Sequence, residues 1–171
     1  MTDSSREVYF KLLGKIAECG VSIRTEHPAV FRIHKAMYAR RDDGSGVIHL
    51  ARDQGGHWVT PTSMAADRET LFSDARDVDE EICILAHELG HHHSTFVGYE
   101  EIRDRLEKDV NLATDAEKQS IFDEEVFAWN WARSVIIDLR LVGTDYFDQV
   151  MKKNLETYKD MWRNETPAKR T

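Results

Sequence analysis

The pentapeptide His87-Glu88-Leu89-Gly90-His91 has the pattern H-E-x-x-H, and it constrains how this part of the chain can fold. Four residues advance an α-helix by about 400°, so both histidines project from nearly the same face, one turn apart. The segment before the pattern favours a helix over about 79–93, because acidic residues fill its first turn. Apolar residues recur there at helical spacing and give the helix a face for the core: Ile82, Leu85, Ala86 and Leu89.

Two imidazoles in this arrangement can bind one tetrahedral metal ion. Glu88 can then reach a water on the same ion and act as a general base. The pattern therefore predicts a zinc hydrolase with His87 and His91 as ligands. The alternative is a buried helix in which two histidines fall four residues apart by chance.

A catalytic zinc usually has three protein ligands and one open position. The candidates for the third ligand are Asp123, Glu124 and Glu125, which begin a second stretch with helical periodicity over about 116–139. Spacing alone leaves the choice among the three open. A solvated acidic helix start is the simpler interpretation of Asp123 and Glu124.

The first pattern, followed by Glu125-x-x-Ala128-x-x-Trp131-Ala132, resembles the ImmA/IrrE-type zinc metallopeptidases of phages and mobile elements. The resemblance covers about 78–135 and, more weakly, a strand at Val47–Leu50. It implies that Glu125 is the third ligand, and that the protein cleaves or inactivates a specific protein such as a transcriptional repressor. Trp129 departs from the family pattern, which often has Asn or Asp there, so a hydrogen bond from that position is absent.

Length and composition predict a single domain over residues 1–171, with a disordered tail at about 165–171. The formal net charge of −8 argues against direct nucleic-acid binding, because phosphate contacts need clustered Lys and Arg. Cys19 and Cys83 lack metal-ligand spacing. Apolar runs are too short for a membrane span, and the absence of a signal-like N-terminus predicts a cytoplasmic protein.

The predicted fold is α+β, a mostly helical zincin-like domain with a small antiparallel sheet beside the metal helix. A first helix ends at Gly20, and further helices are expected over about 99–109 and after 143–144. The turn-rich segment 42–46 predicts a hairpin that joins strands near 37–40 and 47–50. Two more strands are expected, at 21–23 and 57–60, whereas 61–78 gives no clear pattern.

The leading hypothesis is a zinc-dependent endopeptidase with Zn²⁺ as cofactor, Glu88 as general base and a protein as substrate. Four residues are candidate donors to the oxyanion that develops during peptide hydrolysis: His57, Tyr99, Tyr38 and His93. Val47–Leu50 is expected to be an edge strand to which an extended substrate adds. One alternative is a non-catalytic zinc protein that regulates a repressor by binding, and another is a hydrolase of a non-peptide amide.

Overall fold

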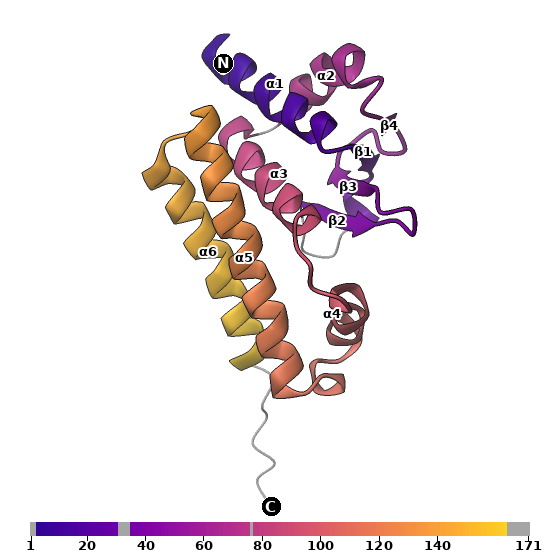
Figure 1. The fold of residues 1–171 in the computed structure, drawn as a ribbon, viewed down its shortest axis with the longest axis vertical. Coiled ribbons are helices and arrows are strands. Elements are labelled where there is room, and N and C mark those ends of the chain that lie inside the picture. Colours follow the sequence, from indigo (N-terminus) through magenta and orange to yellow (C-terminus); the bar gives the residue numbers. More distant parts are fainter. Residues whose placement is uncertain (1–2, 31–34, 76, 164–171) are drawn as a thin grey trace, which may run out of the picture.

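Three helices packed side by side form one half of the molecule, and a small sheet with two further helices forms the other (Figure 1). The computed structural model describes residues 3–30, 35–75 and 77–163, so the tail predicted to be disordered lies outside the described residues. The three helices of the first half are α3 (Val78–His92), α5 (Asp115–Leu139) and α6 (Thr144–Arg163). The α+β class predicted from the sequence is confirmed.

The sheet has four strands in the order β2-β3-β1-β4, and these are β1 (Val21–Glu26), β2 (Ala36–Arg40), β3 (Gly46–Ala51) and β4 (Trp58–Val59). The predicted hairpin is present, since β2 pairs antiparallel with β3. The sheet is mixed rather than wholly antiparallel, because β1 pairs parallel with β3. A short 3-10 turn (Pro28–Val30) follows β1.

Three further helices complete the described part of the chain. α1 (Asp3–Glu18) contacts α2, α3 and β1, and Gly20 follows it with a φ of 72°, as expected for a glycine at a helix end. α2 (Met64–Ser73) lies in the segment 61–78, which has no clear pattern in the sequence. α4 (Tyr99–Lys108) and a 3-10 turn (Val110–Leu112) form the connection from α3 to α5. In the described part of the chain, no helix combines the length and apolar character of a membrane span.

The core is continuous and centres on α3, whose residues from Ile82 to His91 are all buried. α3 and α5 approach closely at Gly90, where a Cβ atom would lie 2.4 Å from the carbonyl oxygen of Ala128. Real carbon–oxygen contacts are about 1 Å longer than this, because close-packed interiors leave no room for overlap. Glycine at position 90 therefore allows the backbones of the two helices to come together beside the two histidines.

A buried ion pair joins the sheet to the start of α3. Arg52, which is 6% exposed, directly follows β3 and donates from Nη1 and Nη2 to the two carboxylate oxygens of Glu81, at 2.7 and 2.5 Å. Tyr9 of α1 also donates to Glu81, at 2.5 Å. A buried charge is tolerated when it is paired, and both terminal nitrogens of Arg52 have partners although its Nε has none, so this contact fixes α1 and the sheet against α3.

Candidate metal centre

His87 and His91 lie on the buried face of α3, each 6% exposed, with ring centroids 4.6 Å apart. The helix begins where the sequence predicts, because the side chain of Asp77 accepts a hydrogen bond from the backbone of Glu80 and caps the first turn. The spacing of the two histidines thus produces the paired imidazoles expected from helical geometry.

Glu125 reaches the same point from α5, which begins with a capping box formed by Thr114 and Glu117. Its Oε2 lies 3.1 Å from Nε2 of His87, and its Oε1 lies 3.6 Å from Nε2 of His91. The three ligand atoms lie within 4.8 Å of one another, and all three side chains are buried. α3 and α5 therefore bring the three side chains together, and the His87–His91–Glu125 group could hold a metal ion.

The positions of the polar atoms in this group suit coordination of a metal ion better than hydrogen bonds among the three side chains. His87 Nε2 and Glu125 Oε2 are both buried and have no hydrogen-bond partner, although they face each other at 3.1 Å. Two ligands on one tetrahedral zinc, with bonds of about 2.0–2.1 Å, lie about 3.3 Å apart. The observed separations of 3.1 and 3.6 Å fall on either side of that value. Two imidazole nitrogens and a carboxylate are a donor set that suits zinc.

The charges of the group are strongly coupled. Burial alone would lower the pKa of His87, but the carboxylates of Glu125 and Glu88 outweigh it and raise the pKa to about 9. Burial alone would raise the pKa of Glu125, yet the charge of His91 and the contact with His87 hold it at about 2. The site therefore presents an ionised carboxylate next to an imidazole that must lose its proton before it can bind a metal.

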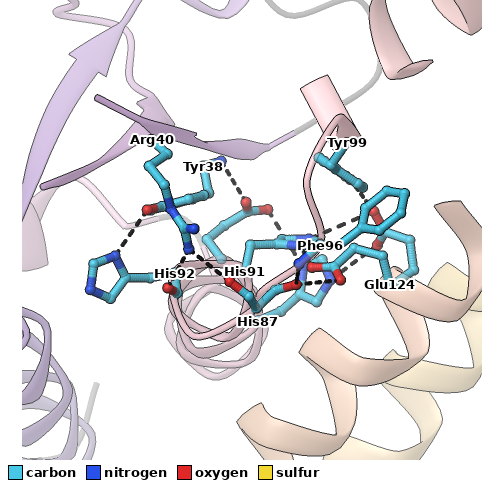
Figure 2. A network of polar contacts seen from close by, with 11 residues as sticks. Tyr38, Arg40, His87, His91, His92, Phe96, Tyr99 and Glu124 are labelled. Atoms are coloured by element: carbon cyan, nitrogen blue, oxygen red, sulfur yellow. Dashed lines mark hydrogen bonds and ion pairs between the residues drawn. The ribbon is translucent and has the colours of Figure 1, made fainter. Parts of the chain in front are cut away.

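Each imidazole is oriented by a different neighbour. The ring of His87 stacks on Trp129 of α5, with centroids 4.3 Å apart and planes 17° from parallel. His91 instead places Nδ1 3.1 Å from Oε1 of Glu124. Figure 2 shows Glu124 and Tyr99 approaching the histidines from the side opposite Tyr38 and Arg40.

The three consecutive acidic residues have three different environments. Asp123 is exposed and accepts a hydrogen bond from Gln119, as expected for a solvated residue. Glu124 is 6% exposed, so its interpretation as part of a solvated helix start is wrong. α5 begins at Asp115, which places all three residues two turns inside the helix, where successive side chains point about 100° apart.

Glu88 is buried beside the proposed ligands. Its Oε2 accepts a hydrogen bond from the backbone N–H of Tyr38 in β2, at 2.7 Å. Burial would raise its pKa, but the neighbouring His87 and His91 outweigh this and lower the pKa. Glu88 is thus an ionised carboxylate at neutral pH, held by the sheet, and it is able to accept a proton.

Two tyrosines surround Glu125. The hydroxyl of Tyr99 in α4 donates to Glu125 Oε1, and Tyr158 of α6 also hydrogen-bonds to this carboxylate. Burial and the charge of Glu125 raise the pKa of both phenols well above the usual value, so both hydroxyls stay protonated. Tyr158 was not among the candidates from the sequence, because nothing in its spacing connects α6 to the histidines.

A cavity of about 260 Å³ opens beside His91, between the end of β2 and the connection from α3 to α4. Its wall includes Tyr38, Arg40, Phe96 and Tyr99. The cavity gives a side chain of a bound molecule space next to the proposed metal ligands.

The side chains of the other three candidate oxyanion donors have different contacts. His57 is exposed and pairs with Asp67 at 3.7 Å. The hydroxyl of Tyr38 lies 2.9 Å from Nδ1 of His92, and the ring of His93 stacks on Trp131. Among the four candidates, it is Tyr99 whose hydroxyl contacts a proposed ligand.

The prediction of an edge strand is wrong. Val47–Leu50 belongs to β3, which pairs with β1 on one side and with β2 on the other, so an added peptide cannot pair with it. The sequence predicted the hairpin from its local turn, but the parallel pairing with β1 joins residues far apart in the chain. The strands at the two edges of the sheet are β2 and β4, and β2 is also the strand whose backbone binds Glu88.

Comparisons of the chain with models of protein families, with curated proteins and with solved structures find no match.

Proposed function

We propose that this protein is a zinc-dependent endopeptidase in which His87, His91 and Glu125 bind the ion and Glu88 is the general base. The observation that supports it most strongly is the buried, ionised Glu88 next to a three-residue group suited to zinc. In the described residues this group has two histidines and one carboxylate. A structural zinc site is normally closed by four protein ligands, whereas a catalytic one keeps a position open.

Zinc bound there would supply a Lewis acid that polarises the scissile carbonyl and lowers the pKa of water. The carboxylate of Glu88 accepts the proton of the attacking water and later delivers it to the departing amine nitrogen. The backbone N–H of Tyr38 holds Oε2 of Glu88, whereas Oε1, which lies 3.5 Å from Nδ1 of His87, is the oxygen that would take part in this transfer. The hydroxyl of Tyr99, which stays protonated, would become a donor to the developing oxyanion once it releases Oε1 of Glu125.

We propose a specific protein as the substrate, such as a transcriptional repressor, on the strength of the resemblance to ImmA/IrrE-type peptidases. The net charge of −8 is consistent with a basic partner and unfavourable for direct contact with nucleic acid. The cytoplasmic location predicted from the sequence agrees with such a substrate.

The metal ligands are tested by the zinc content of purified protein. Wild type should hold about one zinc per chain. His87→Ala, His91→Ala and Glu125→Ala should each weaken binding at least ~10-fold, because two ligands make an incomplete site. Asp123→Ala is the matched control, since Asp123 is an exposed acidic residue on the same turn of α5. Full zinc occupancy in Glu125→Ala would refute the assignment of this ligand.

The general base is tested with Glu88→Gln, which keeps the shape of the side chain but accepts a proton poorly. Zinc should stay bound while cleavage of a transcriptional repressor that wild type cleaves falls at least ~100-fold. The same variant should retain the uncleaved repressor in a pull-down. Cleavage at the wild-type rate would exclude Glu88 as the base. Binding of the repressor without cleavage by zinc-loaded wild type would favour the non-catalytic alternative.

A further inference from the structure

The side chain of Glu124 is buried behind His91, on the side away from the proposed metal position. Its Oε1 lies 3.1 Å from Nδ1 of His91, and its Oε2 accepts a hydrogen bond from Ser94 Oγ at 2.6 Å. Both oxygens of the carboxylate therefore have a partner. Charged groups are rarely buried to this degree unless such contacts hold them.

These contacts determine which nitrogen of His91 carries the proton. An ionised carboxylate can only accept hydrogen bonds, so the proton of a neutral His91 lies on Nδ1. Nε2 is then unprotonated, and this is the nitrogen that lies 3.6 Å from Glu125 Oε1. The lone pair of His91 thus points toward the proposed metal position rather than away from it.

Ser94 is itself held in place. Its Oγ accepts a hydrogen bond from the backbone N–H of Phe96 at 3.0 Å, and its carbonyl oxygen accepts one from Arg40 Nη2 at 2.9 Å. The contacts run from β2 through Ser94 and Glu124 to His91, so the orientation of the imidazole is set by three separate elements.

We propose that Glu124, supported by Ser94, is a positioning residue that fixes the tautomer and ring orientation of His91 for metal binding. This inference rests on the metal site of the proposed function. Carboxylates that accept a hydrogen bond from a ligating histidine raise its basicity and hold its ring, and their loss typically weakens metal binding ~10- to 100-fold.

The test is zinc affinity, measured on the full chain by competition with a chromogenic chelator. Glu124→Ala should bind zinc ~10- to 100-fold more weakly than wild type, because His91 loses its acceptor. Glu124→Gln should recover part of this loss, since its amide oxygen can still accept from Nδ1. Ser94→Ala should give a smaller loss than Glu124→Ala, and Asp123→Asn, the exposed neighbour, should bind like wild type.

Each outcome bears on the proposal. Zinc affinity of Glu124→Ala within twofold of wild type would overturn it, as would a loss in Glu124→Gln equal to that in Glu124→Ala. If Glu124→Ala does not fold, Glu124→Gln and Ser94→Ala decide the question: both must bind zinc more weakly than Asp123→Asn. His87→Ala tests the metal site independently of Glu124. If His87→Ala binds zinc like wild type, the metal site itself is refuted.

Discussion

The close approach of α3 and α5 at Gly90 allows a prediction in which two effects of one methyl group oppose each other. In an α-helix, replacing glycine with alanine stabilises by about 1 kcal/mol through lower backbone entropy in the unfolded chain. At Gly90 the added Cβ would lie 2.4 Å from the carbonyl oxygen of Ala128 and 2.8 Å from its Cα. These atoms are backbone, so no side-chain rotation relieves the overlap.

The steric overlap should outweigh the gain from lower backbone entropy. To restore contacts of about 3.5 Å the helices must move apart by roughly 1 Å, and such overpacking costs about 1–3 kcal/mol. The upper part of this range applies, because both helices are buried along this face. After the gain in helix propensity, Gly90→Ala should lower the free energy of unfolding by about 2 kcal/mol. For a chain of this length that corresponds to a fall in Tm of about 4–8 °C.

The same movement should disturb the metal site. Glu125 precedes Ala128 by three residues and therefore lies one turn away on the same side of α5. Metal–ligand distances tolerate about 0.2 Å of error, so a displacement of about 1 Å should weaken zinc binding at least tenfold. Thermal unfolding of the metal-free protein and chelator competition measure the two effects separately.

Gly14 provides the matched control. It lies in α1, is exposed, and nothing would lie within 4 Å of its added Cβ. Gly14→Ala should therefore raise the stability by about 0.5–1 kcal/mol and leave zinc affinity unchanged. If Gly90→Ala behaves like Gly14→Ala in both assays, the reasoning about the contact between the two helices is wrong.

Three further predictions use other parts of the structure. Tyr99→Phe should keep its zinc but lower turnover of the repressor at least ~10-fold if the hydroxyl stabilises the oxyanion, and unchanged turnover would assign this role to another donor. In the metal-free protein, the pKa of His87 is raised to about 9. The charged imidazole therefore stabilises the fold fully below about pH 6.5, and this stabilisation is lost as the pH rises through 9. The Tm of wild type should fall across that interval, and an equal fall in His87→Ala would contradict the assignment. Arg52→Ala should destabilise by about 3–5 kcal/mol in denaturant unfolding, because it leaves Glu81 buried without its ion pair, whereas a loss below about 1 kcal/mol would show that water replaces the guanidinium.

The local parts of the structure could be predicted from the sequence, because helix periodicity and capping depend on neighbouring residues. α3 and α5 lie within a residue or two of the predicted bounds, and both histidines project together. The segment that contains α2 was missed, because its apolar residues leave no single clear stripe. The resemblance also selected Glu125 from the three acidic residues, in agreement with the observed group.

The parts that depend on packing between distant segments could not be predicted. Glu124 and Glu125 are chemically equivalent neighbours, and what separates them is which side of α5 faces each histidine of α3. The parallel pairing of β1 with β3 likewise joins strands that are not consecutive in the chain, and it places β3 inside the sheet, whose edges are β2 and β4. Such contacts follow from tertiary structure, about which local pattern carries little information.

The arrangement in which α3 and α5 supply all three proposed ligands has a consequence for how such a protein can diversify. The segment between these helices, residues 93–114, carries Phe96 and Tyr99 of the cavity wall but none of the three ligands. Insertions and substitutions there alter which side chains meet a bound molecule, while the helix pair keeps its spacing through Gly90 and Ala128. Selection can thus change the preferred substrate and preserve the chemistry, provided that Ser94 stays in contact with Glu124 and that Tyr99 is retained beside Glu125.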